Sequence, residues 1–166
     1  MEVSQKLIDK INSTIRDVQD FPKKGIVFKD ITPILKNAEL SKEIIKELAN
    51  HVPSQVTHIA GIESRGFLFG FPCAIERDIA FVLIRKKGKL PFKTVSYQYD
   101  LEYGSAEIEM HVDAVGPGDK VIIHDDLLAT GGTAEAAAGL VELSKGKVAA
   151  FIFVINLFDL GGCDKL

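Results

Sequence analysis

Apolar residues recur at the spacing of a helical face in two segments near the start of the chain. The first segment, residues 7–18, carries them at Leu7, Ile8, Ile11, Ile15 and Val18. This spacing predicts an amphipathic helix that ends before Phe21-Pro22. The second segment predicts a helix that begins near Ser41 and stops before Pro53.

Beyond residue 55, short apolar runs alternate with helical stretches. We expect strands over residues 56–62, 79–84, 94–99, 106–112, 120–124 and 148–155, and helices over residues 65–76 and 133–143. Alternating β and α segments with apolar strands predict an α/β fold, in which helices flank both faces of a mostly parallel central sheet. No repeat or linker interrupts the pattern, so we expect a single domain over residues 1–166, with ligands at the carboxyl ends of the strands.

Composition narrows the class of protein. Among 166 residues, 20 Lys and Arg face 23 Asp and Glu, which gives a net charge of −3. A negative chain of this kind is not expected to bind nucleic acid or an anionic membrane surface. The polar N-terminus and the lack of any run of about 18 apolar residues predict no membrane span and a cytoplasmic location. Cys73 and Cys163 are expected to be buried free thiols, with a single bridge between them as the alternative.

The most informative segment is residues 121–133, where a buried strand ends in two acids and a small-residue turn opens a helix. Free backbone N–H groups and the positive end of the helix dipole predict an anion site. The turn supplies Ala129, Thr130, Gly131, Gly132 and Thr133 to that site. Asp125 and Asp126 would repel a phosphate, so we expect them to accept hydrogen bonds from the vicinal hydroxyls of a ribose. The pattern predicts a ribose 5-phosphate site, and the alternative is a solvated acidic strand end before an ordinary turn.

Two other phosphate motifs fail on inspection. Gly61 and Gly66 have P-loop spacing, but Phe67-Leu68 follows where that loop needs Lys and then Ser or Thr. No G-x-G-x-x-G opens a helix after a strand, which disfavours a dinucleotide fold.

The acid pair and its turn resemble the phosphoribosyl diphosphate signature of type I phosphoribosyltransferases. Further segments resemble the adenine-specific branch of that family, in the same order along the chain. They are Phe21-Pro22 and residues 25–31, 63–70, 85–91, 101–104 and 160–166. The resemblance spans nearly the whole chain from about Phe21. It implies the type I fold, with a base-binding segment within residues 1–35 and a flexible catalytic loop within residues 85–110.

The resemblance also implies a reaction. Phosphoribosyl diphosphate and adenine would give AMP and pyrophosphate, as in purine salvage. The implied cofactor is Mg²⁺, held mainly by substrate and water with no direct protein ligand. The implied assembly is a homodimer.

Residue roles follow from the matching motifs. The resemblance places Ser64, Arg65, Arg85, Lys86 and Lys89 on pyrophosphate, with Arg85 in support, and Val27, Phe28 and Lys29 on adenine. Glu102 would handle the N7 proton of adenine, Tyr103 would assist, and Arg65 would act on the leaving group. The family often has a cis peptide in the loop that carries Arg65.

Taken without the resemblance, these residues have simpler interpretations. Arg65 would cap a neighbouring element, Glu102 would be a solvated acid, and Phe28 would be a core aromatic. The cations between Arg85 and Lys89 would form an ordinary solvated loop.

The chain departs from the family pattern at four positions. Lys29 stands where Arg is usual, and His124 where an aliphatic residue is usual, for which a structural role is favoured. Asn156 and Cys163 stand where Glu and Arg often occur. A transferase acting on a 6-oxopurine and a regulator that binds phosphoribosyl diphosphate without catalysis remain as alternatives.

Overall fold

The computed structural model describes residues 3–100 and 105–166. The chain forms two compact units, Met1–His51 and Val52–Leu166. The prediction of one domain over residues 1–166 stays a prediction.

The N-terminal unit contains three helices and a hairpin. Its elements are α1 (Gln5–Thr14), β1 (Arg16–Gln19), β2 (Val27–Asp30), α2 (Thr32–Leu35) and α3 (Ala38–His51). The hydroxyl of Ser4 caps α1 by accepting a hydrogen bond from the Leu7 N–H at 3.3 Å. Strands β1 and β2 pair antiparallel, and Arg16 at one end forms an ion pair with Asp30 at 2.6 Å.

The predicted first helix is too long. Helix α1 ends at Thr14, and Ile15 already has an extended backbone. Val18 lies on β1, opposite Phe28 of β2, rather than on a helix. The spacing of Ile15 and Val18 matches a helix by chance. These β-branched residues have a weak preference for helix, and the hydrogen bonds between β1 and β2 outweigh it.

The second helix begins earlier than predicted, and α2 was not predicted. Helix α3 starts at Ala38 because the side-chain oxygen of Asn37 accepts a hydrogen bond from the Leu40 N–H at 3.1 Å. Helix α2 is a single turn with Pro33 at its start, too short for a periodic signal.

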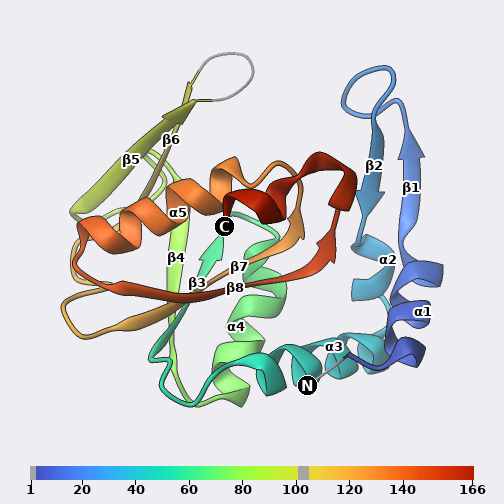
Figure 1. Cartoon of the computed structure of the whole chain (residues 1–166), viewed down its shortest axis with the longest axis horizontal. Coiled ribbons are helices and arrows are strands. Elements are labelled where there is room, and N and C mark those ends of the chain that lie inside the picture. Colours follow the sequence, from blue (N-terminus) through green and yellow to red (C-terminus); the bar gives the residue numbers. More distant parts are fainter. Residues whose placement is uncertain (1–2, 101–104) are drawn as a thin grey trace. The chain divides into compact units, whose positions relative to one another are not determined.

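The C-terminal unit is built on a six-stranded sheet (Figure 1). Its strands are β3 (His58–Ile62), β4 (Ala80–Lys86), β5 (Thr94–Asp100), β6 (Ser105–His111), β7 (Lys120–Leu128) and β8 (Lys147–Asn156), in the order β5-β6-β4-β3-β7-β8. Strands β4, β3, β7 and β8 are parallel, while β6 pairs antiparallel with β4 and forms an antiparallel hairpin with the edge strand β5. The predicted fold class, α/β with a mostly parallel sheet, is confirmed.

Two helices cover opposite faces of this sheet. Helix α4 (Gly66–Glu76) links β3 to β4, and α5 (Gly132–Leu143) links β7 to β8 on the other side of the sheet order. Right-handed crossovers in opposite directions place the two helices on opposite faces. Accordingly, Leu140 of α5 shares a core cluster with Val121 and Ile123.

Helix α4 lies close against β7 on the face that carries His124. A Cβ atom at Gly66 would lie 2.7 Å from the carbonyl oxygen of His124, and one at Gly70 would lie 2.9 Å from the His124 ring. Only residues without a side chain allow this approach. The helix therefore presents small residues to the strand that bears the acid pair.

Strand β7 extends four residues further than predicted. Its pairing with β3 ends at His124, but its pairing with β8 continues through Asp125 and Leu127. The acid pair is therefore inside a strand, paired on one side only, rather than after its end. Two short 3₁₀ turns, Phe158–Leu160 and Gly162–Lys165, close the chain.

Both cysteines are free, as expected, but only Cys73 is buried. Cys163 is exposed, so the prediction of two buried thiols is wrong for it. It lies in the last 3₁₀ turn at the surface, a position that the apolar pattern does not reveal. Within the described ranges, no helix is long and apolar enough to cross a membrane.

Candidate active site

Three neighbouring strands bring the predicted motifs to one edge of the sheet. Strands β4, β3 and β7 are parallel neighbours, with Ile62 opposite Ile84 and Gly61 opposite His124. Their carboxyl ends therefore meet at the same edge. Residues 63–65, 87–89 and 129–133 leave the sheet there, and the last residues of β4 and β7 carry Arg85, Lys86 and the acid pair.

A small cavity lies where β7 turns into α5. It has a volume of about 100 Å³ and is lined by Ile62, Asp125, Phe153 and residues 127–134. Pockets that enclose whole drug-sized ligands measure about 300–1,000 Å³, so this volume suits a single phosphate-sized group.

The start of α5 supplies donors to this cavity. No side chain caps the helix, and the first intrahelical bond runs from the Glu135 N–H to the carbonyl of Gly131 at 2.9 Å. The preceding N–H groups of the first turn are thus available to an anion, which the helix dipole also favours. The predicted turn and hydroxyls, Ala129 to Thr133, lie around this point.

The C-terminal segment supports this turn from behind. Gly131 has a φ of +82°, and a Cβ atom there would lie 2.9 Å from the carbonyl oxygen of Gly162. A Cβ atom at Gly162 would in turn overlap the carbonyl oxygen of Ala129. Sequence reasoning did not assign Gly162 a role, although the Gly161-Gly162 pair was a signal of close backbone contact.

The same segment is tied to the end of β8. The Asn156 side-chain amide donates a hydrogen bond to the Cys163 sulfur at 2.9 Å. The two residues at positions where the family often has Glu and Arg therefore contact each other as a neutral pair. The departure from the family pattern keeps a link between β8 and the C-terminal turn.

The two acids have different surroundings. Asp125 lines the cavity, while Asp126 is 1% exposed and forms an ion pair with Arg65 Nε at 3.0 Å. Burial raises the pKa of Asp125, and repulsion from Asp126 adds to this effect. Asp125 is therefore a carboxylate that additional hydrogen-bond donors, such as ribose hydroxyls, would stabilise.

The loop after β3 joins the cation segment through Glu63. Its carboxylate accepts hydrogen bonds from Arg85 Nε at 3.2 Å and from the Lys86 N–H at 3.0 Å. Burial works to raise the pKa of Glu63, but these bonds outweigh it and leave the pKa lowered. The Glu63-Ser64 peptide is cis, as is often found in the family, and Ser64 is exposed. Sequence reasoning gave Glu63 no role of its own.

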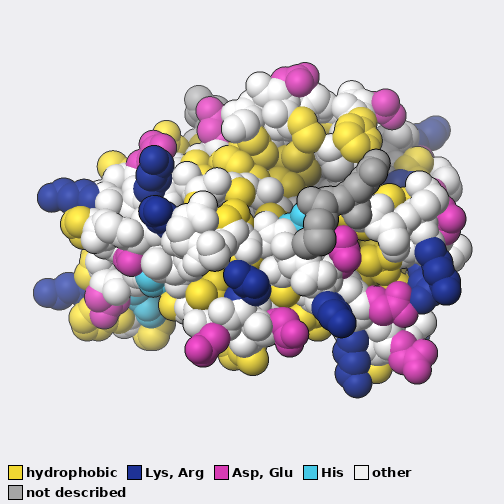
Figure 2. Space-filling view, turned by 60° about the horizontal axis from the view of Figure 1, so that its bottom comes forward, with side chains coloured by type: hydrophobic (Ala, Val, Ile, Leu, Met, Phe, Trp, Pro, Cys, Tyr) yellow, Lys and Arg dark blue, Asp and Glu magenta, His cyan; other side chains and the backbone are white. Residues whose placement is uncertain are grey.

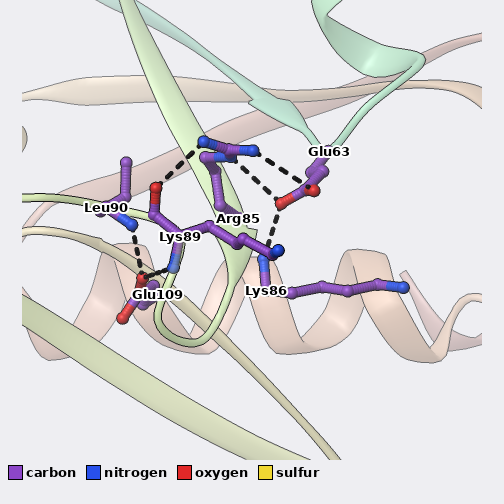
Figure 3. A network of polar contacts seen from close by, with 6 residues as sticks. All are labelled: Glu63, Arg85, Lys86, Lys89, Leu90 and Glu109. Atoms are coloured by element: carbon purple, nitrogen blue, oxygen red, sulfur yellow. Dashed lines mark hydrogen bonds and ion pairs between the residues drawn. The ribbon is translucent and has the colours of Figure 1, made fainter.

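The four cations of residues 85–89, of which Figure 3 labels Arg85, Lys86 and Lys89, fall into two groups by their partners. Arg85 is held by Glu63 and donates to the Lys89 carbonyl at 3.0 Å, while Lys87 pairs with Glu107 at 2.7 Å. The ammonium groups of Lys86 and Lys89 are exposed and have no hydrogen-bond or ion-pair partner in residues 3–100 and 105–166. These two lysines are therefore the cations available to an anionic ligand.

The predicted adenine-binding residues lie on β2 of the N-terminal unit. Val27 is exposed, and Phe28 is half-buried against the edge of Phe21, with ring centroids 5.1 Å apart. Phe28 is thus not a core aromatic. Lys29 Nζ forms an ion pair with Asp17 at 2.8 Å across the hairpin. The predicted catalytic residues Glu102 and Tyr103 lie outside the described residues.

Comparison with known proteins identifies the class. Residues 28–157 match the family model described as phosphoribosyl transferase domain. The chain belongs to the phosphoribosyltransferase family.

Three similar proteins carry the name adenine phosphoribosyltransferase. Adenine phosphoribosyltransferase of Cytophaga hutchinsonii is 51% identical over 100% of this chain and 93% of its own length. The Escherichia coli O1:K1 / APEC protein of the same name is 46% identical over 100% of this chain and 91% of its own length. The solved adenine phosphoribosyltransferase of Thermoanaerobacter pseudethanolicus has a TM-score of 0.92 at 50% identity, covering 95% of this chain and 92% of that one.

His124 adopts the structural role that the sequence favoured. It is 2% exposed, and its Nδ1 lies 2.9 Å from the carbonyl oxygen of Ile152 on β8. Burial lowers the pKa of His124 to about 4, so the ring is neutral at pH 7 and Nδ1 donates to that carbonyl.

The pH dependence of stability tests this assignment. Since the folded-state pKa of His124 is about 4 against an ordinary value of 6.5, the unfolded chain binds the proton more tightly between these values. We expect the free energy of unfolding to fall as the pH drops from 6.5 to 4, with this residue contributing about 3 kcal/mol of the loss. In urea titrations across this range, a His124→Leu variant should lose less stability than the parent. Equal losses in the two proteins would contradict a buried neutral His124.

Proposed function

We propose that this chain transfers the 5-phosphoribosyl group of phosphoribosyl diphosphate to adenine, releasing AMP and pyrophosphate. The observation that carries the proposal is the phosphate-sized cavity at the start of α5, with Asp125 in its wall. At the same edge of the sheet, Lys86 at the end of β4 and Lys89 just after it have no partner among the described residues. A phosphate at one point and a diphosphate nearby are what this substrate presents. The names of the relatives supply the base.

Two complexes of solved relatives agree with these ligands. The Saccharomyces cerevisiae enzyme, at 36% identity and a TM-score of 0.90, covers 98% of this chain and 96% of its own, and is described with adenine and an imino-altritol bisphosphate. The Trypanosoma brucei enzyme, at 26% identity, is described with AMP, pyrophosphate and ribose-5-phosphate.

In this proposal, the cavity takes the 5-phosphate. The N–H groups of the first turn of α5 and the hydroxyls of Thr130 and Thr133 donate to it. Asp125 accepts hydrogen bonds from the ribose hydroxyls. Asp126 holds Arg65 through its ion pair and so assists the ribose site through that residue.

The pyrophosphate leaving group is assigned to the loop after β3 and the segment after β4. Ser64 and Arg65 bind it from the first, and Lys86 and Lys89 from the second. Arg85 supports both because it bridges Glu63 and the Lys89 carbonyl. Fixed cations at this point stabilise the negative charge that develops as the bond to C1 breaks.

The chemistry is a substitution at C1 of the ribose. The bond from C1 to the pyrophosphate oxygen breaks, and adenine N9 forms the new bond while positive charge spreads over the ring. Glu102 takes the proton from N7 of adenine, and Tyr103 assists. Val27, Phe28 and Lys29 bind the base, with Phe28 as the stacking ring.

Magnesium is part of this proposal as an ion that the substrate carries. Among the residues that the structure describes, no three His, Cys, Asp or Glu side chains gather to hold a metal. Diphosphate and ribose oxygens with water would supply the oxygen ligands that Mg²⁺ prefers, next to Asp125. When bound, Mg²⁺ neutralises diphosphate charge, and the lysines complete that neutralisation.

Two further expectations belong to the proposal. One is a homodimer. It is supported by Leu68, Phe71 and Ile75, which are 42%, 52% and 64% exposed at helical spacing on α4 and offer an apolar face to a second copy.

The other is a cytoplasmic enzyme without nucleic-acid or membrane partners. On the face in Figure 2, Lys and Arg side chains are interspersed with Asp and Glu rather than gathered into a basic patch.

The proposed function first predicts base specificity. Purified protein with phosphoribosyl diphosphate and Mg²⁺ should form AMP with adenine and no nucleotide with hypoxanthine or guanine, as separated by chromatography. Product from hypoxanthine or guanine instead would indicate a 6-oxopurine transferase. Binding of phosphoribosyl diphosphate without product from any base would indicate a regulator.

A second prediction concerns Glu102. Glu102→Ala should lower kcat by about a hundredfold or more, since general acid–base catalysis contributes at least that much, while both KM values stay near normal. Steady-state kinetics measure both quantities. An unchanged kcat would remove Glu102 from the proton-transfer step.

A third prediction separates the lysines. Lys86→Ala and Lys89→Ala should each raise the KM for phosphoribosyl diphosphate by about tenfold or more, because each removes a charge-assisted contact. Lys87→Ala is the matched control, since its ammonium already pairs with Glu107. It should change that KM by about twofold at most. Equal effects at all three positions would indicate that the ligand responds to the net positive charge of the segment rather than to specific contacts.

A further inference from the structure

The turn after β4 closes over a buried carboxylate. Glu109 of β6 lies opposite Arg85 of β4 and is 4% exposed. Its Oε1 accepts hydrogen bonds from the backbone N–H groups of Lys89 and Leu90, both at 3.0 Å. Its Oε2 accepts one from the Thr94 hydroxyl at 3.1 Å. Figure 3 shows the two backbone bonds converging on one oxygen.

This carboxylate is held by donors rather than by a cation. Within residues 3–100 and 105–166, Glu109 has no ion-pair partner. Burial alone would raise the pKa of Glu109, but the backbone N–H groups of Leu90, Gly88 and Lys89 and the Thr94 hydroxyl outweigh it and keep the pKa below its usual range. A buried charge of this kind is costly unless its donors are fixed around it.

The main chain of Lys89 is consequently fixed from two directions. Its N–H donates to Glu109, and its carbonyl accepts from Arg85 Nη1 at 3.0 Å, which Glu63 holds in turn. The side chain of Lys89, by contrast, has no hydrogen-bond or ion-pair partner in the part of the chain that the structure describes. In Figure 3 the side chains of Lys89 and Lys86 both extend away from Glu109.

We propose that Glu109 is a positioning residue for diphosphate binding: by holding the backbone of Lys89 and Leu90, it sets where the Lys89 ammonium meets the leaving group. The proposal rests on the assignment of Lys86 and Lys89 to pyrophosphate under the proposed function. Glu109 does not touch the substrate and acts through Lys89.

Two substitutions and a matched control test this role. Glu109→Ala removes every acceptor contact of the carboxylate, whereas Glu109→Gln keeps an oxygen for the N–H groups of Lys89 and Leu90 and gains an amide that can donate to Thr94. Glu107→Ala is the control. Glu107 lies two residues away on the same strand, and its carboxylate contacts the side chains of Lys87 and Ser96, so the substitution leaves its backbone bond to the Lys87 N–H in place.

Steady-state kinetics with each substrate varied in turn should show an effect on the KM for phosphoribosyl diphosphate but not on the KM for adenine. We expect Glu109→Ala to raise the KM for phosphoribosyl diphosphate and the inhibition constant of pyrophosphate by about tenfold, with the KM for adenine within about twofold. Glu109→Gln should stay within about threefold of the parent, and Glu107→Ala within about twofold. Circular dichroism and thermal unfolding check that each variant is folded.

A double variant tests whether Glu109 acts through Lys89. If Glu109 acts through Lys89, Glu109→Ala should add little to the loss in Lys89→Ala, because the two share one contact with the ligand. Additive losses, or an equal rise in both KM values, would overturn the positioning role. If Glu109→Ala does not fold, Glu109→Gln in the Lys89→Ala background decides, and any further rise in the KM for phosphoribosyl diphosphate above about twofold overturns it.

The same data keep the two proposals apart. If Lys86→Ala and Lys89→Ala raise the KM for phosphoribosyl diphosphate and Glu109→Ala leaves it unchanged, the positioning role alone is refuted. Silent lysine variants would refute the pyrophosphate assignment itself, and the positioning role with it.

Discussion

The arrangement of the site depends on the parallel register of three strands. With Ile62 opposite Ile84 and Gly61 opposite His124, the chain leaves β3, β4 and β7 at one edge of the sheet. Parallel strands expose their last residues together, so one register brings a loop arginine, a run of cations and an acid pair within reach of each other. A shift by one residue would also move each side chain of a strand to the opposite face of the sheet, where it would meet the wrong helix. Stability of the core and assembly of the site are therefore the same constraint.

Charge at this edge is arranged so that most groups already have partners. Asp126 holds Arg65, Glu63 holds Arg85, and Glu109 holds the turn that carries Lys89. Carboxylates beside an anion site would repel the ligand if their charge were free. Here they accept hydrogen bonds or ion pairs from the protein, and the lysine ammonium groups and the start of α5 remain for the ligand. Positioning of this kind reduces the reorganisation needed when negative charge develops.

Local patterns predicted the long elements well and the short ones poorly. The strands and helices of the C-terminal unit agree with the apolar pattern because each buries one face against a neighbour. Ile15 and Val18 were assigned to the first helix because a segment as short as the four-residue strand β1 has too few apolar positions to separate a helical from a strand pattern. The pairing of β1 with β2 decides between the two. The end of β7 was missed because acidic residues have low β propensity, yet β8 pairs with them.

Some site residues could be predicted from the sequence and others could not. The acid pair, the glycine turn and the four cations were visible as motifs, since their types and order along the chain carry the chemistry. Glu109 was not visible, because it alternates with the buried Ile108 and Met110 as a solvent-facing residue would. The turn after β4 folds over it and makes it a buried acceptor.

The sequence by itself thus determined the α/β class, the resemblance to the phosphoribosyltransferases and the residues proposed to bind phosphate. Only the tertiary structure decided which of those charges are already paired, which lysines remain free for a ligand, and that the C-terminal glycines pack behind the phosphate turn. The physical reason is that hydrogen bonds and ion pairs join residues distant in the sequence, whereas motifs and periodicity describe neighbours along the chain.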